Sequence, residues 1–212
     1  MSSPILEVKN ISKTFGNIKA LDNVDFYLQK GFVHGLLGEN GAGKSSLMNI
    51  LSGIYIPESG SIKINNQKIE KMTPDIAASF GIGMVHQEFR LIESFSIKDN
   101  LTLSKANIFT DNFKEAYDKY SEIFALNSNY LTPVNELSVG EKQKVEIMKL
   151  IFKNSQIMLL DEPTAVLTPQ ETLQLKDSLE KLSQEDEKTI VLITHKLKEI
   201  KDFTERIFVM KN

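Results

Sequence analysis

Residues 38–45 read Gly-Glu-Asn-Gly-Ala-Gly-Lys-Ser, a complete G-x-x-x-x-G-K-[ST] pattern that follows the apolar run 32–37. Closely spaced glycines let successive backbone N–H groups point at one anion, and a helix starting near Gly43 adds the positive end of its dipole. A simple glycine turn would explain the glycines but not the adjoining Lys-Ser pair. The segment therefore predicts a loop that binds the phosphates of a nucleoside triphosphate.

The side chains that end this pattern have separate expected roles. Lys44 would reach the β and γ phosphates, and the Ser45 hydroxyl would bind Mg²⁺, which neutralises charge that the loop alone could not hold. The nucleotide-binding residues predicted in this segment are Gly38, Glu39, Asn40, Gly41, Ala42, Gly43, Lys44, Ser45 and Ser46.

Composition limits the class of protein. The chain has 212 residues, 41% of them apolar, and its 25 basic and 28 acidic residues leave a net charge of -3. Without an excess of positive charge, no nucleic acid is expected as a partner. The sequence has no cysteine, which rules out disulfides and thiolate zinc sites. No apolar run approaches the roughly 20 residues that span a bilayer, and no secretion signal is recognisable, so we expect a chain that is neither secreted nor membrane-spanning by itself.

Hydrophobic patterning predicts an α/β fold. Alternating apolar and polar residues at 5–9 and 24–28 indicate strands of a small antiparallel layer. Continuous apolar runs at 157–160 and 189–193 suit strands that are covered on both faces of a mainly parallel sheet. Further short strands are predicted at 32–37, 61–64 and 82–85.

A helical block interrupts these strands. Between about residues 89 and 155 the sequence contains helix-compatible stretches, such as 112–124 and 141–152, and no convincing strand. We therefore predict a single domain over 1–212, in which 1–88 and 155–212 form a P-loop core with the antiparallel layer, and 89–154 form an inserted helical subdomain. Helix starts are expected at Thr73-Pro74 and at Thr168-Pro169, where Glu171 would complete a capping box.

Two acids follow the apolar run 157–160. Asp161 and Glu162 would lie at the carboxyl end of a buried strand, where open α/β sheets bind ligands. Asp161 would hold Mg²⁺ through water, and Glu162 would orient and deprotonate the water that attacks the γ phosphate. Taken alone, the pair also fits a solvated strand end. Its combination with the phosphate loop favours the metal and base roles.

The segment Leu137-Ser138-Val139-Gly140-Glu141 opens the last helix before that acidic strand. Ser138 and Glu141 are three residues apart, as in a capping box. At this point the chain resembles the nucleotide-binding domain of ABC transporters, whose signature Leu-Ser-Gly-Gly-Gln lies shortly before the acidic strand. The two interpretations are compatible. The resemblance covers nearly the whole chain, because the phosphate loop, Gln87, the signature, the acidic pair and His195 occur in the family's order.

The resemblance implies an ATPase in which two such domains enclose two ATP molecules. Ser138 and the N–H of Gly140 would then meet the γ phosphate bound by the partner domain. Gln87 would contact Mg²⁺ and the attacking water and link the core to the helical insert, His195 would contact the γ phosphate, and Phe15 would stack on adenine. The plainer alternatives are a surface glutamine, a structural histidine and a core phenylalanine.

Closer similarity is to the ATP-binding subunits of simple-sugar and nucleoside importers, judged from the segments 39–44, 84–87 and 164–169. Those proteins usually carry two ATPase halves in one chain, so we expect this chain to be truncated. Its expected partners are a second nucleotide-binding domain, in the same polypeptide or as a homodimer, and membrane permease subunits. Its expected location is cytoplasmic, peripheral on the inner face of the cell membrane.

Three residues depart from the family pattern. Val139 and Glu141 replace the usual Gly and Gln of the signature, and Thr168 stands where an aspartate is usual. Glu141 would add a negative charge near a partner's triphosphate, so the half-site built from this signature would turn over slowly or only bind. Two alternatives to an importer subunit stay open. One is a cytosolic ABC ATPase that acts on ribosomes, and the other is a binding-only regulatory half of a tandem ATPase.

Overall fold

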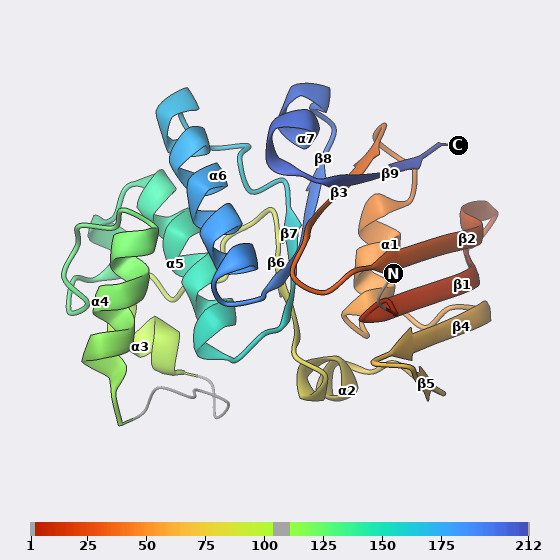
Figure 1. The fold of residues 1–212 in the computed structure, drawn as a ribbon, viewed down its shortest axis with the longest axis horizontal. Helices are drawn as coiled ribbons and strands as arrows, with labels where there is room; N and C mark the ends of the chain where they lie inside the picture. Colours follow the sequence, from red (N-terminus) through yellow and green to blue (C-terminus); the bar gives the residue numbers. More distant parts are fainter. Residues whose placement is uncertain (1–2, 104–110, 212) are drawn as a thin grey trace.

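The computed structural model describes residues 3–103 and 111–211, and these form two sheets with surrounding helices (Figure 1). The antiparallel sheet has the order β2-β1-β4-β5, with β1 (Leu6–Phe15), β2 (Ile18–Leu28), β4 (Ser59–Ile64) and β5 (Gln67–Ile69). The second sheet has the order β6-β7-β8-β3-β9, with β3 (Val33–Gly38), β6 (Ile82–Val85), β7 (Ile157–Asp161), β8 (Thr189–Thr194) and β9 (Arg206–Met210). This arrangement confirms the predicted α/β fold with an antiparallel layer.

Every strand pair in the second sheet is parallel. All residues of β8 are buried, as are the apolar residues of β7, which confirms the expectation for strands covered on both faces. Because β7, β8 and β3 are neighbours that point the same way, their carboxyl ends meet at one edge of the sheet. The segments that follow these strands therefore lie together, and they carry the phosphate loop, the acidic pair and His195.

The helices of the described residues are α1 (Lys44–Leu51), α2 (Pro74–Ser79), α3 (Ile97–Thr102), α4 (Phe113–Ile123), α5 (Val139–Phe152), α6 (Pro169–Gln184) and α7 (Leu197–Phe203), with the 3₁₀ turn η1 (Val134–Glu136). Their starts follow the predicted local chemistry. Thr73 caps α2, and Ser138 and Thr168 form capping boxes at α5 and α6. Gly43 precedes α1 with φ 89°, and a Cβ there would collide with the carbonyl oxygen of Ala20.

The parallel sheet separates two hydrophobic cores. Met158 and Leu160 face the first core, which is shared with α4 and α5, whereas Ile157 and Leu159 face the second, which is shared with α1 and the antiparallel sheet. In Figure 1 the helices α3, α4 and α5 accordingly lie on one side of the molecule and the antiparallel strands on the other. Within 89–103 and 111–154 the structure contains no strand, only an isolated bridge between Ser96 and Pro133.

Several elements differ from the sequence predictions. The sequence patterns predict neither the short elements β5, α3 and α7 nor the edge strand β9, and β2 begins at Ile18 rather than near residue 24. The early start of β2 has no alternating pattern because bulges break the two-residue alternation. Register shifts along β1 and positive φ values at Asn10 (51°) and Asn23 (49°) mark these bulges. Parts of the predicted ranges that include 1–2, 104–110 or 212 lie outside the described residues, and the division at 88 and 155 stays a prediction.

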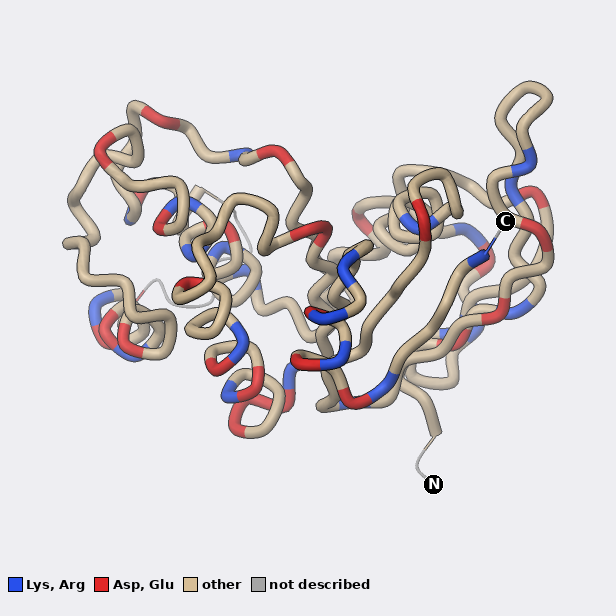
Figure 2. The backbone as a smooth tube through the Cα atoms, turned by 90° about the horizontal axis from the view of Figure 1, so that it is seen from above, with Lys and Arg blue, Asp and Glu red and all other residues tan. Residues whose placement is uncertain are grey.

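Among residues 3–103 and 111–211, the helices are too short or too polar to cross a bilayer. Figure 2 shows Lys and Arg interspersed with Asp and Glu over both the helical part and the two sheets.

Candidate functional site

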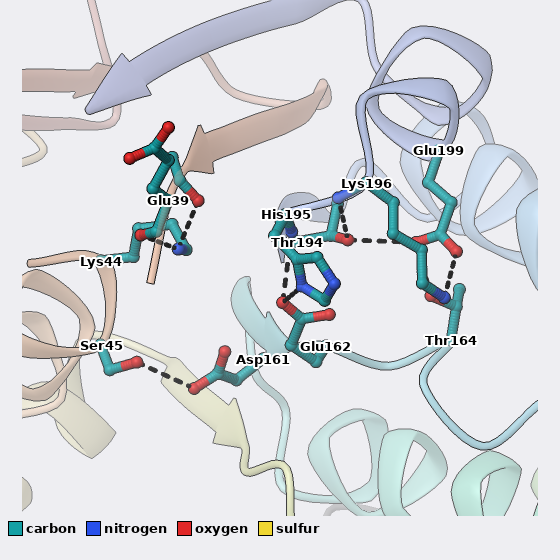
Figure 3. Close-up of polar contacts among 11 residues, drawn as sticks. Glu39, Lys44, Ser45, Asp161, Glu162, Thr164, Thr194, His195, Lys196 and Glu199 are labelled. Atoms are coloured by element: carbon teal, nitrogen blue, oxygen red, sulfur yellow. Dashed lines mark hydrogen bonds and ion pairs between the residues drawn. The ribbon is translucent and has the colours of Figure 1, made fainter. Parts of the chain in front are cut away.

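The phosphate loop connects β3 to α1 and is held by its own lysine. Lys44 is buried, and its Nζ donates hydrogen bonds to the carbonyl oxygens of Gly38 (2.6 Å) and Glu39 (2.9 Å), as Figure 3 shows. An ammonium group has three donors, so two bonds to the loop leave one N–H for an anion. Gly41 (φ 88°) and Gly43 (φ 89°) adopt the left-handed conformation that turns the loop's backbone. The loop is therefore already shaped to hold phosphate.

A cavity of about 300 Å³ brings most of the predicted residues together. Its lining residues are Ile18, Ala20, Asn40, Gly41, Gly43, Lys44, Ser45, Ser46, Gln87, Asp161 and Glu162. A second cavity of about 630 Å³ borders the other side of the loop, and His195 lines it together with Gly38, Glu39, Asn40 and Ala42. Gln87, which follows β6, thus faces the same space as the loop and the acidic pair.

Asp161 and Ser45 supply oxygen atoms that suit Mg²⁺. The Ser45 Oγ lies 3.5 Å from Asp161 Oδ2 (Figure 3). Burial raises the pKa of Asp161, and the neighbouring charge of Glu162 raises it further. A cation would relieve this repulsion. Hard oxygen donors in small number fit Mg²⁺, which usually completes its coordination with water and substrate phosphates.

Glu162 has an unusual backbone and a close partner. Its φ is 49°, a conformation uncommon for residues other than glycine, and its N–H donates to the Ile193 carbonyl oxygen at 2.9 Å. Glu162 Oε1 accepts from the backbone N–H of His195 at 3.2 Å and lies 2.7 Å from His195 Nδ1. In the described part of the chain, the buried Oε2 has no hydrogen-bond partner. Non-glycine residues in this conformation concentrate at functional sites.

Phe15 lies beside the smaller cavity rather than in its lining. It ends β1 and pairs with Ile18, which does line that cavity. Its ring is 40% exposed, with the Tyr55 ring at 5.0 Å edge-to-face and Lys13 Nζ 5.3 Å from its centroid. The exposed ring rules out the core-packing alternative and leaves a surface on which a base could stack.

The signature residues lie apart from both cavities. Ser138 is exposed and caps α5 by accepting from the Glu141 N–H at 3.2 Å. Glu141 in turn accepts from the Ser138 N–H at 2.9 Å and from the Ser128 Oγ at 2.6 Å. Although burial raises the pKa of Glu141, these hydrogen bonds outweigh it and hold the pKa below its usual value. Its carboxylate is therefore turned to its own chain, which argues against the expected charge effect on a partner's triphosphate.

Next to the acidic pair lies a polar cluster that sequence patterns do not predict. Glu199, on α7, accepts hydrogen bonds from Thr164, Thr194 and Lys196. The contact between Thr164 and Glu199 has no sequence signal, because these residues are 35 positions apart and meet only when β7 and β8 are paired.

Comparisons with known proteins agree with this geometry. The family model described as "ABC transporter" matches residues 21–165. The nucleoside import ATP-binding protein NupA of Lactococcus lactis subsp. cremoris is 40% identical over 98% of this chain and 42% of its own length. The ribose import ATP-binding protein RbsA of Caldanaerobacter subterraneus subsp. tengcongensis is 41% identical over 99% of this chain and 43% of its own length. The chain thus spans less than half the length of these curated relatives.

Solved structures show the same fold. A nucleotide-free ATP-binding cassette from an ABC transporter superposes with a TM-score of 0.86 at 26% identity, over 98% of this chain and 88% of that one. A dimeric bacterial ABC transporter cassette superposes with a TM-score of 0.83 at 28% identity, over 97% of this chain and 94% of that one.

Proposed function

This chain belongs to the ABC transporter family, and we propose that it binds ATP with Mg²⁺ and hydrolyses it as an ATP-binding subunit of an importer of sugars or nucleosides. The observation that carries the proposal is the single cavity in which the phosphate loop, Gln87, Asp161 and Glu162 meet. The import proteins among its relatives support the solute class. When bound, Mg²⁺ neutralises phosphate charge as the γ phosphate is released.

The proposed roles follow from position in the site. The loop residues Gly38–Ser46 bind the phosphates through backbone N–H groups and Lys44. Ser45, Asp161 and Gln87 would hold Mg²⁺ through oxygen atoms. Glu162 is the general base, because it lines the cavity of the phosphate loop and His195 holds its carboxylate through Oε1.

Two further proposals concern the edges of the site. His195 Nδ1 lies 2.7 Å from Oε1 of Glu162, which lines the cavity of the phosphate loop, so we assign His195 a contact with the γ phosphate. The exposed ring of Phe15, next to the cavity-lining Ile18, would stack on adenine with a contribution of about 1 to 3 kcal/mol.

We propose that dimerisation brings signature residues to the nucleotide site, because the site in this chain contains none of its own. Ser138 and Gly140 line neither cavity, so we propose that they complete the site of a second nucleotide-binding domain, where the start of α5 would meet the γ phosphate. The dimeric cassette of the same fold supports this arrangement. The helical residues 89–154, proposed as a subdomain of one domain over 1–212, would contact permease subunits at the inner face of the cell membrane. ATP-driven closure and reopening would move those subunits.

The test is ATP turnover of the variant Glu162→Gln. We expect phosphate release to fall by about 10²–10⁴-fold, because the amide cannot accept the proton, while the Kd for ATP stays within a few-fold of wild type. The exposed Glu115 on α4 offers the matched control, and Glu115→Gln should retain full turnover. Turnover that survives in Glu162→Gln refutes the base assignment. A wild-type chain that binds ATP without turnover, even when paired with its natural partner, would favour the binding-only half instead.

A further inference from the structure

Glu199 joins two segments that are distant in the sequence. Its Oε2 accepts from Thr164 Oγ1 at 2.6 Å and from Thr194 Oγ1 at 3.2 Å, while its Oε1 accepts from Lys196 Nζ at 2.8 Å (Figure 3). The side chain of Glu199 is 13% exposed, and Thr164 and Thr194 are buried. Hydrogen bonds to a carboxylate that is shielded from water are among the stronger ones in proteins.

These contacts lie directly behind the proposed catalytic pair. Thr164 is two residues after Glu162 in the segment that leaves β7, and Thr194 ends β8 immediately before His195. The Thr194 hydroxyl also accepts from the Lys196 N–H at 3.1 Å, so it fixes the turn that carries His195. Glu199 therefore holds both segments from one side, whereas Glu162 and His195 meet on the other.

The strain at Glu162 makes this support necessary. A φ of 49° at a glutamate costs on the order of 1 to 3 kcal/mol and persists only where the surroundings hold the backbone in place. The Glu162 N–H bond to Ile193 supplies one restraint and the Thr164 bond to Glu199 supplies the next along the chain. Glu199 lines neither cavity beside the phosphate loop, so it acts on these segments and not on the nucleotide.

We propose that Glu199 is a positioning residue for ATP hydrolysis: its carboxylate ties Thr164 to Thr194 and thereby keeps Glu162 in contact with His195. This inference rests on the proposed ATPase function. Glu199 lies in the N-terminal turn of α7, so α7 sets the distance between the general base and its histidine.

The kinetic test separates positioning from binding. Glu199→Ala should lower kcat about 10²-fold, as expected for a misplacement of about 1 Å, with the Kd for ATP within about two-fold of wild type. Glu199→Gln should retain most turnover, because one amide oxygen can still accept from both threonines. Glu180→Ala is the matched control, since it removes only a partly exposed ion pair with Lys176 (2.9 Å) on α6 and should leave kcat unchanged.

A spectroscopic readout keeps the test independent of hydrolysis. The ring nitrogen chemical shifts of His195 report its contact with Glu162 and should move in Glu199→Ala, while those of His34 and His86, the other two histidines, stay as in wild type. If the wild-type chain shows no turnover even when paired with a second nucleotide-binding domain, the proposed function fails, but the His195 signal still tests positioning. Unchanged His195 shifts together with unchanged kcat overturn the proposal, as does a parallel loss of ATP binding and kcat.

A nearly isosteric variant covers the case in which Glu199→Ala does not fold. Thr164→Val removes the shorter threonine bond and leaves the carboxylate with its other partners, so it should reproduce both the fall in kcat and the His195 shift in weaker form. Wild-type behaviour of Thr164→Val contradicts the proposed positioning role of Glu199.

Discussion

His34 in β3 is a fully buried histidine outside the site. Its Nε2 accepts from the Gln29 N–H at 3.0 Å, and the residue is 0% exposed. Burial and, to a smaller degree, the Arg206 charge together lower the pKa of His34 to about 4, against the opposing effect of the carbonyls of Phe32 and Ile190. The imidazole is therefore neutral in the folded chain at neutral pH.

His34 should make the stability of the fold depend on pH. Between its ordinary pKa of 6.5 and about 4, the unfolded chain binds a proton that the folded chain does not. The free energy of unfolding should fall by up to about 3 kcal/mol as the pH drops through this window, and the full stability is present above it. Urea unfolding at neutral pH and at about pH 5 measures the loss.

The control variant is His34→Gln, whose amide oxygen can still accept from Gln29 but does not titrate. Its stability should change less between the two pH values than that of the wild type. An equal loss in both proteins would assign the pH dependence to other groups.

At the scale of elements, the start of α5 explains why Glu141 can replace the family's usual residue. Both of its oxygens are engaged within the chain, one by the Ser138 N–H and the other by Ser128 Oγ. A Cβ on Gly140, next to it, would collide with the carboxylate of Glu171 at the start of α6, which would then have to move. The two capped helix ends are therefore packed against each other, and α5 presents Ser138 outward.

Glu141→Gln tests whether the carboxylate stabilises α5 or slows a partner's turnover. We expect the free energy of unfolding to fall by about 1 kcal/mol, because a neutral amide accepts these hydrogen bonds less strongly, and we expect no gain in ATP turnover. Chemical unfolding and phosphate release measure the two effects. Ser128→Ala should lower the stability by a similar amount as a control. A several-fold rise in turnover would show that the charge acts on the partner's site after all.

At the scale of the whole molecule, one edge of the parallel sheet collects the phosphate loop, the acidic pair and His195, while the signature lies on the helical side. A second domain is needed to bring a signature to this edge. The second domain has two possible sources, a second copy of this chain or a further segment of a longer protein, because the relatives are more than twice as long as this chain.

Light scattering on Glu162→Gln distinguishes the two sources. With ATP and Mg²⁺ the mass should rise from 23.9 kDa to twice that value, since blocked hydrolysis traps the closed pair. Adding Lys44→Ala to the same variant should abolish ATP binding and keep the protein monomeric. A Glu162→Gln chain that binds ATP and stays monomeric contradicts self-pairing and points to a different second domain.

Short-range patterns account for what the sequence determines alone. Contacts within a few residues form the glycine loop and the capping boxes at Ser138 and Thr168, and continuous apolar runs mark the buried strands β7 and β8. The sequence alone therefore predicts these elements. The family's motifs likewise indicate Lys44, Asp161 and Glu162, and the structure places them around one cavity.

Only the tertiary structure decides the contacts that join these segments. The Glu162–His195 pair, the clamp of Glu199 on Thr164 and Thr194, and the Ser128 bond to Glu141 link residues up to 35 positions apart, and no local pattern encodes such distances. The first two arise because parallel strands place their carboxyl ends side by side and because α7 packs behind them, whereas the third arises because the segment after α4 lies against the start of α5. The sequence thus determines which groups are present and how each helix starts, whereas the folded sheet determines which groups touch.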